Sequence, residues 1–585
     1  MFDAIFEELG GNVGVPPDYL KLLTLLVAGY PLAYPLPYLP TTLKHLTNIV
    51  VSFFYLFGVL NLHHGYLQLL GTSLITFALT KYNVNFLGVK MPWIVFGVQM
   101  AHLTVNHLIR AYGGIPLTTI EITAAQMVMC MNLTSFAWSV YDGRRQEDKL
   151  DAQQKEHRVL SSEFPSLVEF LGYAFFFPGV LVGPSSRFVD YRRWANGTLY
   201  GSSSNSSSSP SQLPPPGRLY AGSKELVMGV AGLALWSVGT PYCNFEALLL
   251  PSGAPGALAD RPFLARLAIL IAAGLFTRSK YYGIWGLANG SCILSGLSYN
   301  GLAPIPSPSQ ASGQQALSAK NDVSTKSKWD RCRNIDPLNI EFANNWKELL
   351  DAWNMNTNVW LRNCVYKRVA KQGKKPGFKS TMITFITSAF WHGVAPGYYL
   401  TFVLGGLCQS VGRTLRRHLR PIFYTDPRSP NPTLFNWTSF NTGQILYSMA
   451  SVLVVQLSMS YTILYSMASV LVVQLSMSYT VIPFQLLSIQ DSLKGWKLLN
   501  YYVVLVVAGI MISFRLGLGK SLDRVSGVEK QKREAKINGS TAASASKAGN
   551  PQVPDVDAAQ KEAEKKAKEL GDLAGEKVDE LRKSR

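Results

Sequence analysis

One histidine of the sequence stands inside an apolar stretch. His392 lies in ITFITSAFWHGVAPGYYLTFVLGG, between Trp391 and Gly393. Ionisable groups at membrane depth mark functional sites by default, and imidazole, with a pKa of about 6.5, is the cheapest of them to bury in its neutral form. A neutral imidazole is also a natural general base for an alcohol near neutral pH. The alternative is a histidine that only hydrogen-bonds between helices, and location alone does not decide between the two.

A second candidate is an asparagine that precedes His392 by 38 residues. Asn354 lies in WNMNTNVWLR, where Trp353, Asn354, Thr357 and Trp360 fall at helical spacing. A buried amide must hydrogen-bond, and it can orient a substrate carbonyl or stabilise a developing oxyanion. The alternative is an asparagine-rich amphipathic helix at the membrane interface, with its aromatic residues in the core.

The elements that position these residues are expected to be membrane helices. Charged residues make up 16% of the chain, against about 25% in soluble domains. Apolar stretches recur along the sequence, but several are shorter than the roughly 20 residues of a full span or are broken by Pro and Gly. Such segments suit re-entrant or tilted elements around an enclosed cavity. We expect an all-α, polytopic integral membrane protein with about 11 transmembrane or re-entrant helices that enclose a catalytic tunnel.

The chain divides into a long membrane part and a polar tail. We expect a membrane domain over residues 1–520, with low-complexity loops at 196–218 and 302–328, and a partly disordered, partly helical tail over 521–585. Residues 445–462, ILYSMASVLVVQLSMSYT, recur unchanged at 463–480. Eighteen residues make five helical turns, so the copy preserves the facing of everything after it. We interpret it as a recent tandem duplication or a sequence-assembly artefact, not as a functional repeat.

The net charge of +19 is concentrated in short loops. Leu361 to Thr381 holds seven Lys or Arg and no acidic residue. Short basic loops beside apolar spans are typical of the cytoplasmic side of a membrane, and this pattern excludes a nucleic-acid interpretation. Such loops also attract anionic headgroups or a phosphate-rich cosubstrate.

Five segments together resemble the membrane-bound O-acyltransferase (MBOAT) family. FWHGVAPGYY is similar to the family's catalytic histidine box, which maps that role to His392, and in WNMNTNVWLR Asn354 takes the place of the catalytic asparagine. The other three boxes match the lysophospholipid acyltransferase branch: SFAWSVYDGRR, PSLVEFLGYAFFFPGVLVGPSSRFVDY and RSKYYGIWGLANGSCILSGLSYNG. The boxes stand in the family order, and the resemblance covers about residues 1–520. One departure is Asn289, where the family pattern carries an acidic residue, and it leaves acceptor preference open.

The resemblance implies a fold, a reaction and a set of site residues. It implies the MBOAT fold and transfer of a fatty acyl group from acyl-coenzyme A (acyl-CoA) to the free sn-2 hydroxyl of lysophospholipids, as in fungal broad-specificity enzymes. His392 would be the general base and Asn354 would position the acyl carbonyl or the histidine. The expected tunnel residues are Trp353, Trp360, Trp391, Tyr282 and Asn289. The expected contacts with the phosphates of acyl-CoA are Arg362, Lys374, Lys375 and Lys379, for which simple membrane topology is the alternative interpretation.

The same interpretation sets the expected partners. They are lysophospholipid, acyl-CoA as a cosubstrate and the bilayer, in the endoplasmic reticulum membrane, with no tightly bound cofactor, no metal and no nucleic acid. The metal interpretation fails because His102 and His107, at i and i+5, do not share a helical face. Arg187 and Asp190 are expected to form a structural ion pair.

Two alternatives to a lysophospholipid acyltransferase stay open. The acceptor could be diacylglycerol, a sterol or a protein, although the three branch boxes favour lysophospholipid. The chain could instead be a lipid transporter or scramblase with His and Asn along a pathway. A transporter is typically built from pseudo-symmetric halves, whereas this sequence repeats only its local 18-residue segment.

Overall fold

The computed structural model describes residues 2–116, 118–200, 213–302, 327–343, 345–370, 376–423 and 470–525. All regular secondary structure within these ranges is helical, beside two isolated β-bridges that pair Phe86 with Val89 and Leu302 with Ser327. The expected all-α class is therefore confirmed for this part of the chain. Most of the predicted low-complexity loops and tail falls on 201–212, 303–326 and 526–585, outside the described residues.

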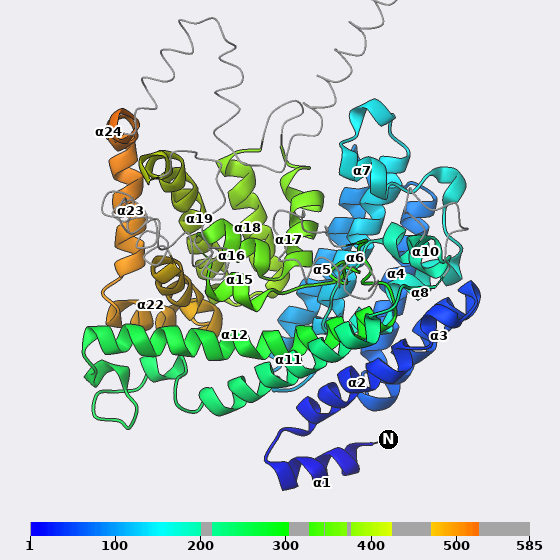
Figure 1. Cartoon of the computed structure of the whole chain (residues 1–585), viewed down its shortest axis with the longest axis horizontal. Coiled ribbons are helices and arrows are strands. Elements are labelled where there is room, and N and C mark those ends of the chain that lie inside the picture. The colour runs from blue at the N-terminus through cyan, green and yellow to red at the C-terminus, as the bar shows by residue number, and fades with distance from the viewer. Residues whose placement is uncertain are drawn as a thin grey trace, which may run out of the picture.

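The first half of the chain forms the helices of one side of the molecule (Figure 1). They are α1 (Asp3–Val13), α2 (Pro17–Ala33), α3 (Thr41–Phe53), the π-helix η2 (Phe54–Val59), α4 (His63–Lys81), α5 (Met91–Tyr112), α6 (Thr123–Gly143), α7 (Ala152–His157), α8 (Leu167–Ala174), α9 (Phe177–Val180) and α10 (Phe188–Ala195).

The second half begins with two long helices, drawn in green, that run across the molecule above α1 in Figure 1, and most of the later helices lie above them. They are α11 (Arg218–Gly239), α12 (Phe263–Leu294), α15 (Pro337–Glu341), α16 (Trp346–Ala352), α17 (Met355–Leu361), the π-helix η8 (Arg362–Tyr366), α18 (Phe378–His392), α19 (Pro396–Phe423), a helix over Val470–Leu486, α22 (Ile489–Leu498), α23 (Tyr502–Arg515) and α24 (Leu518–Val525).

The two lower helices, α11 and α12, pack through glycines. A Cβ atom at Gly232 would lie only 2.8 Å from the backbone nitrogen of Gly283, and one at Gly286 would lie 3.4 Å from the Cα atom of Gly229. Small residues let membrane helices approach closely enough for backbone contact. Packed against α11 in this way, α12 places Arg278, Tyr281 and Trp285 in the interior of the molecule.

Within the described residues, two helices are long and apolar enough to cross a bilayer, and a third span is possible if a bent pair counts as one. The two are Pro17–Tyr38 and Thr41–Val59, and the pair, α22 with α23, bends by 82°. The expected count of about 11 spanning or re-entrant helices is therefore not confirmed.

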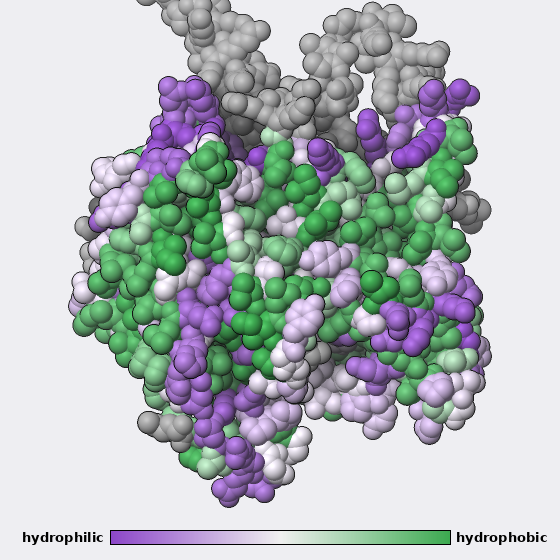
Figure 2. All heavy atoms as spheres, turned by 180° about the vertical axis from the view of Figure 1, so that it is seen from behind, coloured by the Kyte–Doolittle hydropathy of each residue, from purple (hydrophilic) through white to green (hydrophobic). Residues whose placement is uncertain are grey.

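Polar side chains on inward-facing helices explain the low count. α5 has 22 residues, yet Gln99 donates to Thr72 Oγ1 at 2.9 Å and Asn106 donates to Gln126 Oε1 at 2.8 Å. These buried groups satisfy one another inside the protein and lower the hydropathy of each helix. The outer surface is different: Figure 2 shows apolar side chains across the middle of one face, with hydrophilic ones along its upper edge.

The second copy of the 18-residue duplication is part of the described fold. Its residues from Val470 onward lie in the helix Val470–Leu486, whereas residues 445–469 lie outside the described ranges. Gln474 accepts a hydrogen bond from Arg278 Nη2 at 3.1 Å and donates to the backbone carbonyls of Ile340 and Glu341 at 2.9 and 3.0 Å. Arg278 also forms a bidentate pair with Glu341, at 2.8 and 2.6 Å.

This placement predicts that the two copies respond differently to the same substitution. Gln474→Leu should lower the thermal stability of the detergent-solubilised protein, because each buried partner left unsatisfied costs about 1–3 kcal/mol. Gln456→Leu, the same change in the identical first copy, is the matched control and should have no comparable effect. The thermal stability of both variants is measured by heating samples and monitoring the loss of folded protein by size-exclusion chromatography. An equal loss in the two variants would contradict the assignment of the second copy to this position.

Candidate active site

The candidate base, His392, is the last residue of α18. Its Nδ1 atom lies 2.7 Å from the backbone carbonyl of Ser388. A carbonyl only accepts, so Nδ1 carries the proton and Nε2 keeps a free lone pair. The ring packs between Trp391 and Phe402, each with its ring centroid 4.7 Å away. Gly393 then ends the helix at φ 145°, a conformation that favours glycine.

The candidate amide, Asn354, occupies the N-cap position of α17. Its backbone is left-handed, with φ 45° and ψ 53°, which asparagine tolerates better than most residues. Thr357 Oγ1 donates to Asn354 Oδ1 at 2.7 Å. The amide oxygen is therefore engaged, and among the described residues the amide nitrogen has no hydrogen-bond partner. It is available as a donor to a bound group.

Asn354 and His392 line the same cavity, which has a volume of about 740 Å³. Its wall is mostly apolar and is drawn from α5, α6, α12, α16, α17, α18, α19 and the helix Val470–Leu486. The two charged side chains of this lining are both paired: Arg110 with Glu121 at 2.5 Å, and Arg278 with Glu341. We call this space the apolar cavity.

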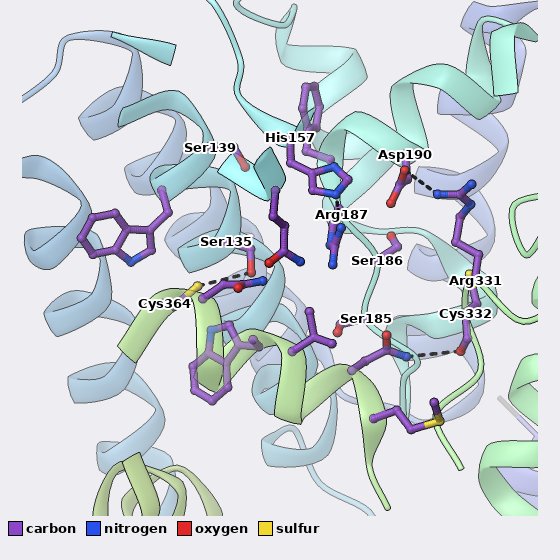
Figure 3. A pocket seen from close by; sticks show the side chains of 18 of the residues that line it. Ser135, Ser139, His157, Ser185, Ser186, Arg187, Asp190, Arg331, Cys332 and Cys364 are labelled. Carbon is purple, nitrogen blue, oxygen red and sulfur yellow. Dashed lines mark hydrogen bonds and ion pairs between the residues drawn. The ribbon is translucent and has the colours of Figure 1, made fainter. Parts of the chain in front are cut away.

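A second space, of about 300 Å³, lies on the other side of α17, and we call it the polar cavity. Figure 3 shows its side chains converging from several elements. Its basic lining residues are His157, Arg187, Arg331, Arg333, Lys367 and Arg368, and its acidic ones are Asp142, Asp190 and Asp330.

Most of the basic side chains that line the polar cavity are neutralised by carboxylates. Arg331 pairs with Asp190 at 2.8 Å, and Arg368 holds Asp142 through two bonds, the shorter at 2.6 Å. Arg187 differs, because within the described ranges no carboxylate lies within ion-pair distance of its guanidinium.

Arg187 instead donates through Nη1 to Nε2 of His157. Burial and the neighbouring Arg187 charge both lower the pKa of His157 below its ordinary value. The imidazole therefore stays neutral and accepts. The carboxylates of Asp190 and Glu156 act on the Arg187 charge from a distance, but within the described ranges neither forms an ion pair with its guanidinium.

α17 and η8 form the partition between the two cavities. Asn354, Thr357, Asn358 and Leu361 line the apolar cavity, at helical spacing on one face. The opposite face, Met355, Asn356, Val359, Trp360 and Asn363, lines the polar cavity. Ser185 borders both cavities, so the two spaces meet beside this partition.

Comparison of the chain with known proteins shows its family. The profile of the membrane-bound O-acyltransferase family matches residues 108–453, a range that contains both Asn354 and His392. The chain belongs to the MBOAT family. The resemblance seen in the sequence boxes is thereby confirmed, and with it the membrane character of the protein and an acyltransferase activity.

Several relatives of this MBOAT protein match over most of their length. The lysophospholipid acyltransferase of Schizosaccharomyces pombe is 37% identical over 530 residues, which cover 89% of this chain and 91% of the relative. That of Saccharomyces cerevisiae is 35% identical, covering 88% and 76%. Lysophospholipid acyltransferase 1 of Arabidopsis thaliana is 27% identical, covering 78% and 92%.

Five residues are expected in the tunnel of this MBOAT protein. Two of them, Trp353 and Trp391, line the apolar cavity. Trp360 faces the polar cavity, and its indole donates to Thr134 Oγ1 at 2.8 Å. Tyr282 is not part of either lining; its hydroxyl donates to Glu341, whereas the preceding residue, Tyr281, faces the apolar cavity. One step along a helix turns a side chain by about 100°, which accounts for the exchange.

Asn289, the departure from the family pattern, is also absent from both linings. Its side chain is 2% exposed and hydrogen-bonds to Glu225 of α11. A carboxylate from a neighbouring helix therefore lies beside the position where the family pattern carries one. The place of Asn289 in the tunnel wall therefore stays a prediction, since this part of α12 packs against α11.

Of the four expected phosphate contacts, Arg362 lies beside the polar cavity, Lys379 is not part of its lining, and two lie outside the described residues. Arg362 is exposed and donates to Gln153, a lining residue, at 3.4 Å. Lys379 is exposed at the start of α18, and Lys374 and Lys375 lie outside the described ranges.

The ion pair expected between Arg187 and Asp190 is not formed, because Asp190 pairs with Arg331. Sequence spacing could not reveal the pair of Asp190 with Arg331, since these two residues are 141 positions apart. In the described part of the chain, no group of three or more His, Cys, Asp or Glu side chains is arranged to hold a metal ion.

Proposed function

We propose that this MBOAT protein is an acyl-CoA-dependent lysophospholipid O-acyltransferase that acylates the free sn-2 hydroxyl. The single observation that carries the proposal is an imidazole with its proton held on Nδ1 and its Nε2 free, in the same cavity as an amide with a free nitrogen. The names of the yeast and plant relatives support lysophospholipid as the acceptor.

His392 and Asn354 are proposed to act in one direct transfer. The acceptor hydroxyl gives its proton to Nε2 of His392 as its oxygen bonds to the thioester carbonyl carbon. The amide nitrogen of Asn354 donates to the oxyanion that forms. When the carbon–sulfur bond breaks, the CoA thiolate leaves and takes the proton back from the imidazolium. No covalent acyl-enzyme is needed, because the thioester is already activated.

The two cavities suit the two ends of the acyl donor. The polar cavity carries the Arg187 guanidinium, which has no ion-pair partner among the described residues and matches a phosphate of CoA, and the apolar cavity matches the fatty acyl chain. The shared border at Ser185 and the partition α17 bring the thioester close to Asn354. The exposed basic residues Arg362 and Lys379, with Lys374 and Lys375, would attract the nucleotide toward this cavity.

This assignment predicts an effect of Arg187 on the acyl donor alone. Arg187→Gln should raise the KM for acyl-CoA by about 10- to 100-fold, since a hydrogen bond to a charged group is worth about 1.5–3 kcal/mol. The KM for lysophospholipid should change little. Initial rates at varied oleoyl-CoA, with lysophospholipid at saturation, measure the effect.

The matched control for this experiment is Arg193→Gln. Arg193 lies on the adjacent α10, its side chain is 40% exposed, and it lies outside the polar cavity lining. It should leave both KM values unchanged. An unchanged KM for acyl-CoA in the Arg187 variant would rule out the polar cavity as the nucleotide site. If, in addition, the KM for acyl-CoA rises in variants of Lys374, Lys375 and Lys379, the phosphates are assigned to the basic segment instead.

We also propose the endoplasmic reticulum membrane as the location, with the full set of about 11 helices of the MBOAT fold around the two cavities. The acceptor class is tested by an acceptor panel. Microsomes from cells that lack their own lysophospholipid acyltransferases, but express this chain, should transfer labelled oleate to lysophospholipids and not to diacylglycerol or sterol. Transfer to diacylglycerol or sterol alone would replace the proposed acceptor.

A further inference from the structure

A second histidine contacts the backbone that carries the proposed base. His107 of α5 is 8% exposed and lines the apolar cavity. Its Nε2 atom lies 3.2 Å from the backbone carbonyl of Trp391, the residue directly before His392. Because a carbonyl only accepts, Nε2 of His107 must carry a proton and donate.

The carbonyl that His107 contacts belongs to the last turn of α18. The last four carbonyls of a helix have no partner within the helix, and they need one from elsewhere when they are buried. The Ala389 carbonyl accepts from the backbone nitrogen of Gly393 at 3.2 Å. His107 supplies the partner of the Trp391 carbonyl from a helix far away in the sequence.

The same imidazole also lies against the residue after His392. A Cβ atom at Gly393 would lie 3.6 Å from Nδ1 of His107. His107 therefore bonds to the backbone before His392 and lies close to the residue after it, while the Ser388 carbonyl accepts from the His392 ring. His107 is thus placed to hold the end of the helix that carries His392.

We propose that His107 is a positioning residue that fixes the end of α18 and so aims the His392 imidazole at the acceptor hydroxyl. The proposal rests on the role of His392 given above. His107 is assigned no proton transfer and no substrate contact. Displacement of a reacting group by about 1 Å can lower a rate by about 100-fold, so a loose helix end should lower turnover without weakening substrate binding.

The experiment compares two substitutions at His107 with a control on the same helix. His107→Leu removes the donor, whereas His107→Gln keeps one, because its amide nitrogen stands as many bonds from Cβ as Nε2 of histidine. The control is His102→Leu, since His102 lies outside the cavity lining and, among the described residues, hydrogen-bonds only to Gln68, at 3.1 Å. kcat and both KM values are measured on purified protein, together with thermal stability.

We expect His107→Leu to lower kcat by about 10- to 100-fold with both KM values near wild type, and His107→Gln to recover most of the loss. His102→Leu should match wild type. The proposal is overturned if His107→Leu keeps the wild-type kcat, if Gln is no better than Leu, or if the main effect is on KM. It is also overturned if both substitutions lower kcat only in proportion to lost folded protein.

Failure of this inference is distinguishable from failure of the proposed function. His392→Ala is included in the same series. If His392→Ala is inactive and His107→Leu is normal, only the positioning role is lost. If His392→Ala retains activity, the proposed function of the site fails, whatever His107 does.

Discussion

Replacement of His392 by alanine is expected to lower kcat for acyl transfer by about 10²–10⁴-fold, the range of a general base. The side chain holds a free imidazole nitrogen in the cavity that Asn354 also lines, and its ring lies at a helix end. Its removal takes away the proton acceptor and leaves the helix intact. His392→Gln, which is similar in size but is not a base, should lose activity to the same degree.

The measurement is the initial rate of oleoyl transfer to lysophospholipid by purified protein, at saturating substrates. His64→Ala is the matched control, because His64 is exposed at the start of α4 and lies outside both cavity linings. It should keep the wild-type rate. A His392→Gln variant with substantial activity would show that the residue has a structural role only, and the general-base mechanism would be wrong.

Removal of the Asn354 side chain is expected to lower kcat by about 10²–10³-fold, as for the loss of one oxyanion donor. Asn354→Gly is the informative change, because the left-handed backbone of this residue would add strain to an alanine variant. The glycine variant keeps the backbone conformation and removes only the amide. Asn354→Asp, which cannot donate when ionised, should be at least as defective.

The control for Asn354→Gly is Asn500→Gly. Asn500 has a left-handed backbone as well, with φ 54°, but it is exposed and lies outside both cavity linings. The comparison separates the loss of the amide from the effect of glycine on chain flexibility. Equal rates for the two glycine variants would mean that the Asn354 amide does not take part in catalysis.

The residues closest to the chemistry were predictable because each carries a local signal. His392 interrupts an apolar stretch, and Asn354 stands between aromatic residues at helical spacing. The structure then brings Trp353 and Trp391 to the same cavity as the two candidates. The roles of the pair in catalysis remain predictions, since geometry alone does not measure a rate.

The other site residues could not be predicted from local patterns. Arg331 meets Asp190 across 141 positions, and no sequence spacing reports such a contact. Tyr281 and Tyr282 are neighbours in the sequence, and only the packing of α12 decides which one faces the cavity. His107 was considered only as a metal ligand, whereas its contact with the Trp391 carbonyl depends on how α5 and α18 pack.

The expected helix count is not confirmed, for a related reason. Apolar stretches in the sequence predict spans, but helices such as α4, α5 and α6 pair polar side chains on their inner faces. A helix of this kind is long enough to cross a bilayer, but its polar inner face lowers its mean hydropathy below that of a typical span. An all-α class needs only helical patterns, and for that reason it was predicted correctly.

The most direct test of the account is transfer of labelled oleate from oleoyl-CoA by microsomes that carry the wild type, His392→Gln or Asn354→Gly at equal expression. Each is offered lysophospholipid, diacylglycerol and sterol. We expect transfer by the wild type to lysophospholipid, and a loss of this transfer in both variants. Transfer to lysophospholipid that persists in His392→Gln, or wild-type transfer only to another acceptor, would contradict it.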